Sequence, residues 1–166
     1  GEMDWFGLDL DHTLVKYRLP ALLPHIYACL GATLLRCGRD ASGGELLPRD
    51  ALTSHPFDAA FCSRGLVFDT RTGDLLRLST PRGRVCAARH GYTGALLTAD
   101  EVQIKYGVEA WRDYTLLLDT GKAPDALVCS TFFDSPAIQL LALMVDQADA
   151  KSKRDANVST LPLYAH

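Results

Sequence analysis

The shorter hydrophobic runs of the chain have the length and flanking turn residues of β-strands. One run covers residues 4–10 and stops at two aspartates. Two more, at 65–69 and 75–79, flank a turn that contains Gly73. This pattern predicts a β-hairpin, and a further strand at 84–88 would extend it into a small sheet. We therefore expect an N-terminal strand and, in the middle of the chain, a sheet built on a hairpin.

Longer stretches carry apolar residues at helical spacing. The first helix is expected to begin near Pro24, which a first turn tolerates, and to end at Gly38 in a left-handed conformation. Thr98 and Glu101 form a capping-box pattern, which predicts the start of a second helix. A third helix, with Pro136 in its first position, is apolar on most sides and should be well buried.

The mixture of strands and helices indicates an α/β fold, in which residues 1–149 are expected to be the N-terminal part of one domain. From Asp149 onward the sequence becomes polar, and residues 150–166 are predicted to be a polar tail or linker. With 166 residues, of which 48% are hydrophobic, the chain is large and apolar enough to bury a core.

Two aspartates at the end of the first predicted strand are the main candidates for chemistry. Alternate residues of a strand point the same way, so Asp9 and Asp11 can converge at its carboxyl end, followed by Thr13. Convergent carboxylates suit Mg²⁺, which is completed by water and substrate phosphate. An acidic turn after a strand is the simpler alternative for the two aspartates alone. The longer Asp-x-Asp-x-Thr string favours the metal site.

These residues carry a resemblance to a known family. The sequence Asp-Leu-Asp-His-Thr-Leu at 9–14 resembles the first motif of haloacid dehalogenase-like phosphohydrolases, and residues 7–17 look like the cytosolic purine 5′-nucleotidase branch. Further blocks of that branch are Arg-Gly-Leu-Val-Phe-Asp at 64–69, Gly-Asp-Leu-Leu-Arg-Leu at 73–78, Arg-His-Gly-Tyr at 89–92 and Phe-Asp-Ser-Pro at 133–136. The resemblance covers most of residues 4–149 and implies a partial Rossmann-like core, in which cap-side hairpin and helices follow the first catalytic strand.

The resemblance implies a two-step, Mg²⁺-dependent phosphoryl transfer from a nucleoside monophosphate or another small phosphate monoester. Asp9 would attack the phosphorus to form an aspartyl-phosphate. Asp11 would protonate the leaving oxygen and later activate water. The ion would be held by the Asp9 side chain and the Asp11 backbone carbonyl, and Thr13 would brace the loop.

The resemblance also places His90 and Tyr92 near the nucleotide base, where an aromatic ring could stack on a purine. The alternative is that Tyr92 packs in the core and His90 caps a turn. The sequence leaves both interpretations open.

Later elements of the family pattern are missing: a Ser or Thr at a second strand end, a Lys, and a pair of acids. Ser130 and Thr131 come too early and are interpreted as a strand end or turn, and Lys122, Asp119 and Asp125 do not fit the remaining positions. Two hypotheses follow. The chain is the N-terminal part of a phosphoric monoester hydrolase, or it is a catalytically inactive nucleotidase-like scaffold or binding subunit of a larger assembly.

Charge and cysteine usage narrow the possible partners. A net charge of −3 predicts no broad attraction to nucleic acid or to anionic membranes. No apolar run is expected to be long enough to cross a bilayer, and we expect a cytoplasmic protein, alone, as a homo-oligomer or in a larger assembly. Five scattered cysteines without a Cys-x-x-Cys pair are interpreted as small buried residues in a reducing compartment, with no zinc site.

Overall fold

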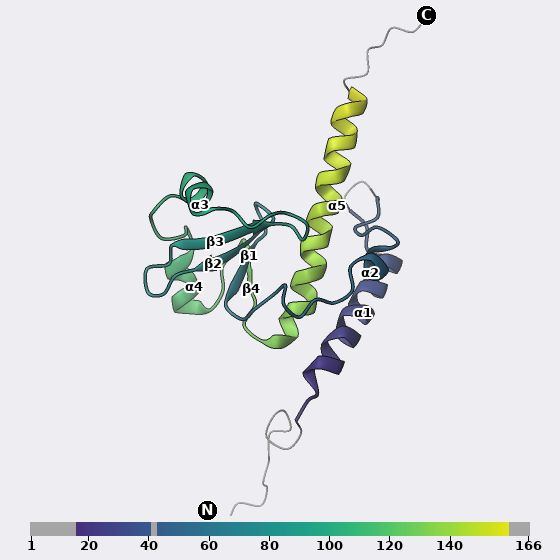
Figure 1. Cartoon of the computed structure of the whole chain (residues 1–166), viewed down its shortest axis with the longest axis horizontal. Coiled ribbons are helices and arrows are strands. Elements are labelled where there is room, and N and C mark those ends of the chain that lie inside the picture. The colour runs from purple at the N-terminus through teal and green to yellow at the C-terminus, as the bar shows by residue number, and fades with distance from the viewer. Residues whose placement is uncertain (1–15, 41–42, 160–166) are drawn as a thin grey trace, which may run out of the picture.

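The computed structural model describes residues 16–40 and 43–159, which form a mixed α/β structure. The elements stack in layers (Figure 1): α3 and α4 on one face of a four-stranded sheet, the long helix α5 on the other, and α1 with α2 beyond α5. The predicted α/β class is confirmed. The predicted strand at residues 4–10 lies outside the described residues.

The sheet is antiparallel throughout, in the order β3-β2-β1-β4. Its strands are β1 (Leu66–Asp69), β2 (Asp74–Leu78), β3 (Val85–His90) and β4 (Ala126–Val128). The predicted hairpin and third strand are therefore confirmed. Gly73, with φ of 72°, supplies the left-handed conformation of the β1–β2 turn, and its N–H donates to the Asp69 carbonyl.

Both faces of the sheet are covered, which explains why its strands are apolar on both sides. Phe68 and Leu75 pack against Ile138 and Ala142 of α5. On the opposite face, a second cluster joins the sheet to α3 and α4 and contains Val67, Leu76, Val85, Ala88, Val102 and Trp111. The sheet is thus the centre of the hydrophobic core.

Helix α1 (Leu19–Cys37) differs from its prediction at both ends. It begins at Leu19 rather than near Pro24, because Pro20 occupies the first turn, where no backbone N–H is needed. Pro24 then lies inside the helix. At the other end Gly38 is extended, with φ of −72°, so the predicted left-handed ending is wrong; its N–H still donates to the Leu34 carbonyl and closes the last turn.

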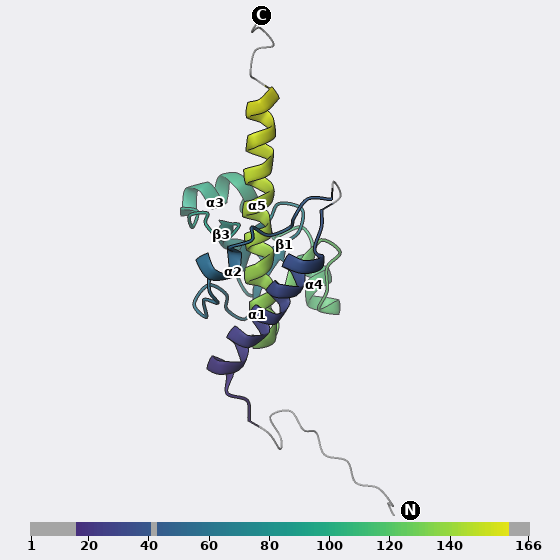
Figure 2. The same cartoon turned by 90° about the vertical axis from the view of Figure 1, so that its right-hand side faces the viewer.

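The expectation that no apolar run could cross a bilayer is also wrong. Within the described part of the chain, α1 is long and apolar enough to do so by length and composition. Core helices of soluble proteins and signal sequences meet the same criterion. In the structure α1 packs along α5 (Figure 2), where Tyr27 contacts Leu140 and Leu143, while most of its other surface is exposed.

The remaining helices are α2 (Ala51–Ser54), α3 (Ala99–Tyr106), α4 (Tyr114–Thr120), the 3₁₀ turn η1 (Phe132–Asp134) and α5 (Ser135–Ser159). The capping box of α3 is confirmed: Thr98 Oγ1 accepts from the Glu101 N–H, and the Glu101 carboxylate accepts from the Thr98 N–H.

The polar segment after Asp149 does not begin as a linker. Helix α5 continues through it as far as Ser159, because an established helix extends at little cost and Ala, Lys and Arg are good helix formers. Lys151 also anchors it: its Nζ lies 2.7 Å from Asp40 Oδ2 and 2.6 Å from the Glu45 carbonyl oxygen.

Candidate functional site

A pocket at the start of α1 lies close in sequence to the predicted catalytic segment. Asp9, Asp11 and Thr13 themselves lie outside the described residues. Chain length limits Thr13 to within about 20 Å of Leu19 and Asp9 to within about 35 Å of it. Leu19 and Pro20 line the pocket.

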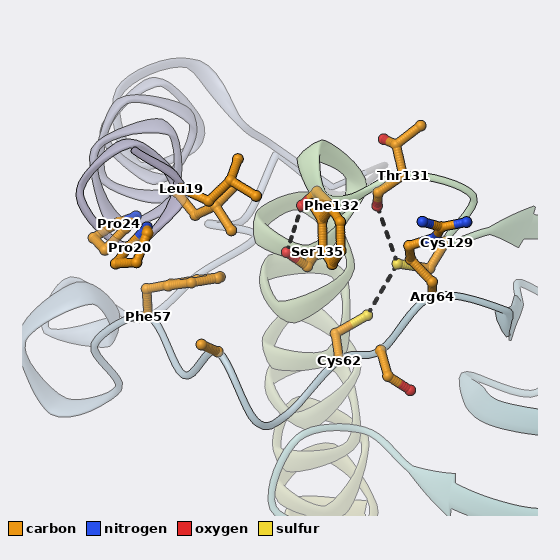
Figure 3. Close-up of a pocket in the computed structure, with 13 residues that line it drawn as sticks. Leu19, Pro20, Pro24, Phe57, Cys62, Arg64, Cys129, Thr131, Phe132 and Ser135 are labelled. Carbon is orange, nitrogen blue, oxygen red and sulfur yellow. Dashed lines mark hydrogen bonds between the residues drawn. The ribbon is translucent and has the colours of Figure 1, made fainter. Parts of the chain in front are cut away.

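Three segments far apart in the sequence form this pocket, which has a volume of about 580 Å³ (Figure 3). They are the first turns of α1, residues 57–64 before β1, and residues 129–135 between β4 and α5. Apolar side chains, among them Leu23 and Phe57, make up most of the wall.

Few polar groups face the pocket. Ser135 Oγ donates to the Phe132 carbonyl (2.7 Å) and is thereby occupied. The Arg64 guanidinium lies 5.5 Å from the centre of the Phe132 ring, and no carboxylate of a described residue forms an ion pair with it. The pocket wall is therefore mostly apolar, and the Arg64 guanidinium is the positive charge among the residues that line it.

His90, one of the two predicted substrate-binding residues, bridges two carboxylates. Its Nδ1 lies 2.8 Å from Asp74 Oδ1, and its Nε2 lies 2.9 Å from Asp149 Oδ2. Burial by itself lowers the pKa of His90, but the hydrogen bonds to Asp74 and Asp149 outweigh it and raise the pKa above 6.5. The side chain of His90 thus ties β3 to β2 and α5.

Asp74 is the buried centre of this network, with 1% of its surface exposed. Besides His90 it accepts from Lys105 Nζ (2.7 Å) and from the Tyr106 hydroxyl, both on α3. Burial raises the pKa of Asp74, yet the hydrogen bonds from Lys105, Tyr106 and His90 lower it overall. The charged carboxylate holds α3 against the sheet.

Tyr92, the other predicted substrate-binding residue, packs between aromatic rings. Its ring centre lies 4.7 Å from that of Phe61 and 5.2 Å from that of His55. Its N–H donates to Asp146 Oδ1 on α5 (3.2 Å). The structure therefore brings His90 and Tyr92 together beside α5, and their contact with a substrate stays a prediction.

The pocket and the His90 network lie toward opposite ends of one stretch of α5. Ser135 lines the pocket and Asp149 binds His90, a separation of about 21 Å at the rise of an α-helix. A single nucleotide base cannot contact both. The two places are therefore separate candidates for the nucleoside part of a substrate.

Comparisons with known proteins identify the family. A sequence model of the 5′ nucleotidase family matches residues 1–165. The "5′-nucleotidase domain-containing protein 1" of Homo sapiens is 33% identical over 146 residues, which cover 86% of this chain and 30% of that protein. The Bos taurus protein of the same name is 32% identical over the same shares. This chain belongs to the 5′-nucleotidase family.

Membership in the 5′-nucleotidase family confirms the resemblance drawn from the Asp9–Thr13 motif and agrees with a haloacid dehalogenase-like assignment. The chain spans about 30% of the length of these relatives.

Ser130 and Thr131 have the structural role expected for a strand end. They follow β4, and both the Thr131 N–H and the Ser130 hydroxyl donate to the Asp134 carboxylate (2.7 and 3.1 Å). These bonds cap the turn that leads into α5, so the interpretation of this pair as a turn is confirmed.

An ion pair between Asp69 and Arg112 was missed by the sequence analysis. The two guanidinium nitrogens Nη1 and Nη2 lie 2.7 and 2.9 Å from the two carboxylate oxygens of Asp69, which is fully buried. Burial raises the pKa of Asp69, but hydrogen bonds from Arg112 and from the Arg71 N–H lower it overall. The only sequence signal is an aspartate that ends an apolar strand, and nothing points to its partner 43 residues later.

The His90 network makes stability depend on pH. The pKa of His90 is raised in the folded protein. The contribution of His90 to the free energy of unfolding is therefore complete below pH 6.5, and it is lost as the pH rises through the pKa of the folded state. The imidazole is 38% exposed, so solvent screening keeps the loss below about 1 kcal/mol. Urea unfolding should show a larger fall in stability between pH 6 and pH 8.5 for the unmodified chain than for His90→Gln. Equal falls would contradict the prediction.

Proposed function

We propose that this chain takes part in the hydrolysis of nucleoside 5′-monophosphates or closely related phosphate monoesters, with Mg²⁺ as cofactor. The observation that carries the proposal is the Asp-x-Asp-x-Thr string at residues 9–13 at the head of a chain that belongs to the 5′-nucleotidase family. The two relatives carry "5′-nucleotidase domain" in their names.

The proposed chemistry divides the work between two carboxylates. The Asp9 carboxylate attacks the phosphorus, the P–O bond to the nucleoside breaks, and Asp11 gives its proton to the leaving oxygen. In the second step Asp11 takes a proton from water, whose oxygen attacks the phosphorus and frees Asp9 and inorganic phosphate. Thr13 braces the loop between them.

The donor set of the motif fits a magnesium ion. Carboxylate and carbonyl oxygens are the hard ligands that Mg²⁺ prefers, and both are available at Asp9 and Asp11. The bound ion would neutralise phosphate charge, which lets an anionic nucleophile approach an anionic substrate. Within residues 16–40 and 43–159, no group of three or more His, Cys, Asp or Glu side chains could hold a metal ion. The proposal of a metal site at the motif rests on the donor groups of Asp9 and Asp11.

Mg²⁺ binding is the direct test of this assignment. We expect isothermal titration of the chain to detect Mg²⁺ binding, and Asp9→Ala to weaken it at least about tenfold, because one of few charged ligands is lost. An excess of EDTA should stop phosphate release from inosine monophosphate. The matched control is Asp100→Ala, an exposed carboxylate in the first turn of α3, which should bind as the unmodified chain does. Binding that survives Asp9→Ala would place the ion elsewhere.

The second candidate is a non-catalytic, nucleotidase-like binding subunit. It is favoured by α1, whose surface away from α5 is largely exposed and includes Leu30 at 41% exposure. Exposed apolar surface commonly marks an interface. Absence of any Mg²⁺-dependent phosphate release, combined with stable self-association in light scattering, would support this candidate. A cytoplasmic location stays a prediction under either function.

A further inference from the structure

Two buried cysteines that are far apart in the sequence lie side by side in the wall of the pocket. Cys62 Sγ donates a hydrogen bond to Cys129 Sγ across 3.4 Å. The residues are 7% and 1% exposed, and both are free thiols. Figure 3 shows the two sulfur atoms pointing toward each other, one from the segment before β1 and one from the end of β4. The proposed hydrolysis uses neither of them.

We propose that Cys62 and Cys129 are a modification site, at which a hydroperoxide forms a reversible intramolecular disulfide. An S–S bond is about 2.05 Å long, so the sulfurs need to approach by only about 1.3 Å. Cys62 lies outside any helix or strand, which leaves its backbone freer to make this adjustment.

The other cysteines do not offer a comparable pair. Cys29, Cys37 and Cys86 are exposed, which corrects the expectation that all five are buried. Cys29 and Cys37 are both in α1, about 12 Å apart along the helix, which is beyond the reach of a disulfide. Within the described residues, the arrangement therefore singles out Cys62 and Cys129.

The hydrogen bond assigns different roles to the two sulfurs. Burial raises the pKa of Cys129 overall, and the S–H of Cys62 and the positive charge of Arg64 offset only part of that rise. For Cys62, burial and the hydrogen bond to Cys129 both raise the pKa. Cys129 therefore ionises more readily and is the nucleophile, and Cys62 is the thiol that resolves the intermediate.

The reaction balances with one hydroperoxide. The Cys129 thiolate attacks the outer peroxide oxygen, the O–O bond breaks, and an alcohol, or water from hydrogen peroxide, leaves after taking up a proton. Cys129 is then a sulfenic acid. The Cys62 sulfur attacks the Cys129 sulfur, the S–O bond breaks, and the hydroxyl leaves as water with the Cys62 proton. The hydroperoxide gains two electrons, and a dithiol reductant reverses the change.

The position of the two cysteines in the pocket lets a small oxidant reach them, and a crosslink there would change the pocket walls. Both cysteines line a cavity of about 580 Å³, which admits a molecule as small as hydrogen peroxide. The disulfide would join residues 57–64 to the connection between β4 and α5, and so fix two of the three pocket walls. It closes a loop of 67 residues, which restricts the unfolded chain.

The test uses the chain of 166 residues with Cys29, Cys37 and Cys86 replaced by serine. Treatment with hydrogen peroxide should lower the intact mass by about 2 Da without dimerisation. Peptide mapping should then find a link between Cys62 and Cys129. The midpoint of thermal unfolding should rise by about 5–10 °C and return after dithiothreitol.

Single replacements in the same background separate the roles. With Cys62→Ser, peroxide should add oxygen to Cys129 and the mass should rise; with Cys129→Ser, Cys62 should react more slowly. The unmodified chain is treated and mapped in parallel. If a variant misfolds, the crosslink between Cys62 and Cys129 can still be sought in the unmodified chain. A mass gain without a crosslink in the triple variant, or a crosslink in the unmodified chain that uses an exposed cysteine instead, would overturn the proposal.

Discussion

Replacement of Asp9 by asparagine is expected to lower the rate of Mg²⁺-dependent phosphate release from inosine monophosphate by at least about 10³-fold, if the proposed mechanism holds. The amide cannot act as the nucleophile, and it carries no charge to hold the ion. Such a fall corresponds to about 4 kcal/mol of transition-state stabilisation. The measurement is phosphate release at saturating Mg²⁺, with the same chain preparation for both proteins.

The matched control is Asp100→Asn, which removes a carboxylate of the same size from an exposed position in α3. Its rate should equal that of the unmodified chain. Equal rates for the unmodified chain and Asp9→Asn would contradict the assignment of Asp9 as the nucleophile. If the unmodified chain itself releases no phosphate, the chain is not catalytic, and the binding-subunit candidate is favoured.

Replacing Arg112 by methionine lowers the free energy of unfolding by about 3–5 kcal/mol. The change leaves the Asp69 carboxylate fully buried and without its two strongest hydrogen bonds. Methionine retains much of the length of the side chain, so the lost partner, rather than lost volume, dominates the effect. Urea unfolding at pH 7 measures the change. The control is Arg82→Met, because Arg82 is an exposed residue in the β2–β3 loop. Its free energy of unfolding should be within about 0.5 kcal/mol of that of the unmodified chain.

Two further measurements separate the buried charge from a general loss of packing. Combining Arg112→Met with Asp69→Asn should cost less than Arg112→Met alone, because no unpaired charge remains in the core. In the unmodified chain the lowered pKa of Asp69 gives stability above pH 3.8 that is lost as the pH falls through the folded value. In Arg112→Met the buried Asp69 has lost its ionic partner, which raises the pKa of that carboxyl. Protonation then removes the unpaired charge as the pH falls, so the deficit of the variant should shrink between pH 7 and pH 4. A deficit independent of pH, with no recovery in the double variant, would contradict the prediction.

The parts of the fold that depend on neighbours in the sequence were predicted well. The turn at Gly73 and the capping box of Thr98 and Glu101 are each determined within a few residues, and the structure contains both. The ends of α1 and the length of α5 were predicted poorly. Pro24 and Gly38 are compatible with more than one helix position, and the polar residues after Asp149 favour a helix only once α5 has been formed.

The candidate site also has parts that neighbouring residues in the sequence define and parts that depend on distant residues. The Asp9 and Asp11 motif is local and was read directly from the sequence; the family match confirms the family, and the role of the two aspartates stays a prediction. His90 was singled out, but its bridging role was not predicted, because Asp74 and Asp149 lie 16 and 59 residues away. Likewise, no local signal pairs Asp69 with Arg112.

The sequence by itself determined the family, the mixed α/β class and the hairpin, because each rests on a contiguous pattern of residues. Only the tertiary structure decided which charges are neutralised in the core, which walls enclose the pocket, and that Cys62 meets Cys129. The two partners are 43 residues apart for Asp69 and Arg112 and 67 residues apart for Cys62 and Cys129. Their formation depends on how the sheet and α5 pack in three dimensions, and sequence spacing does not encode that arrangement.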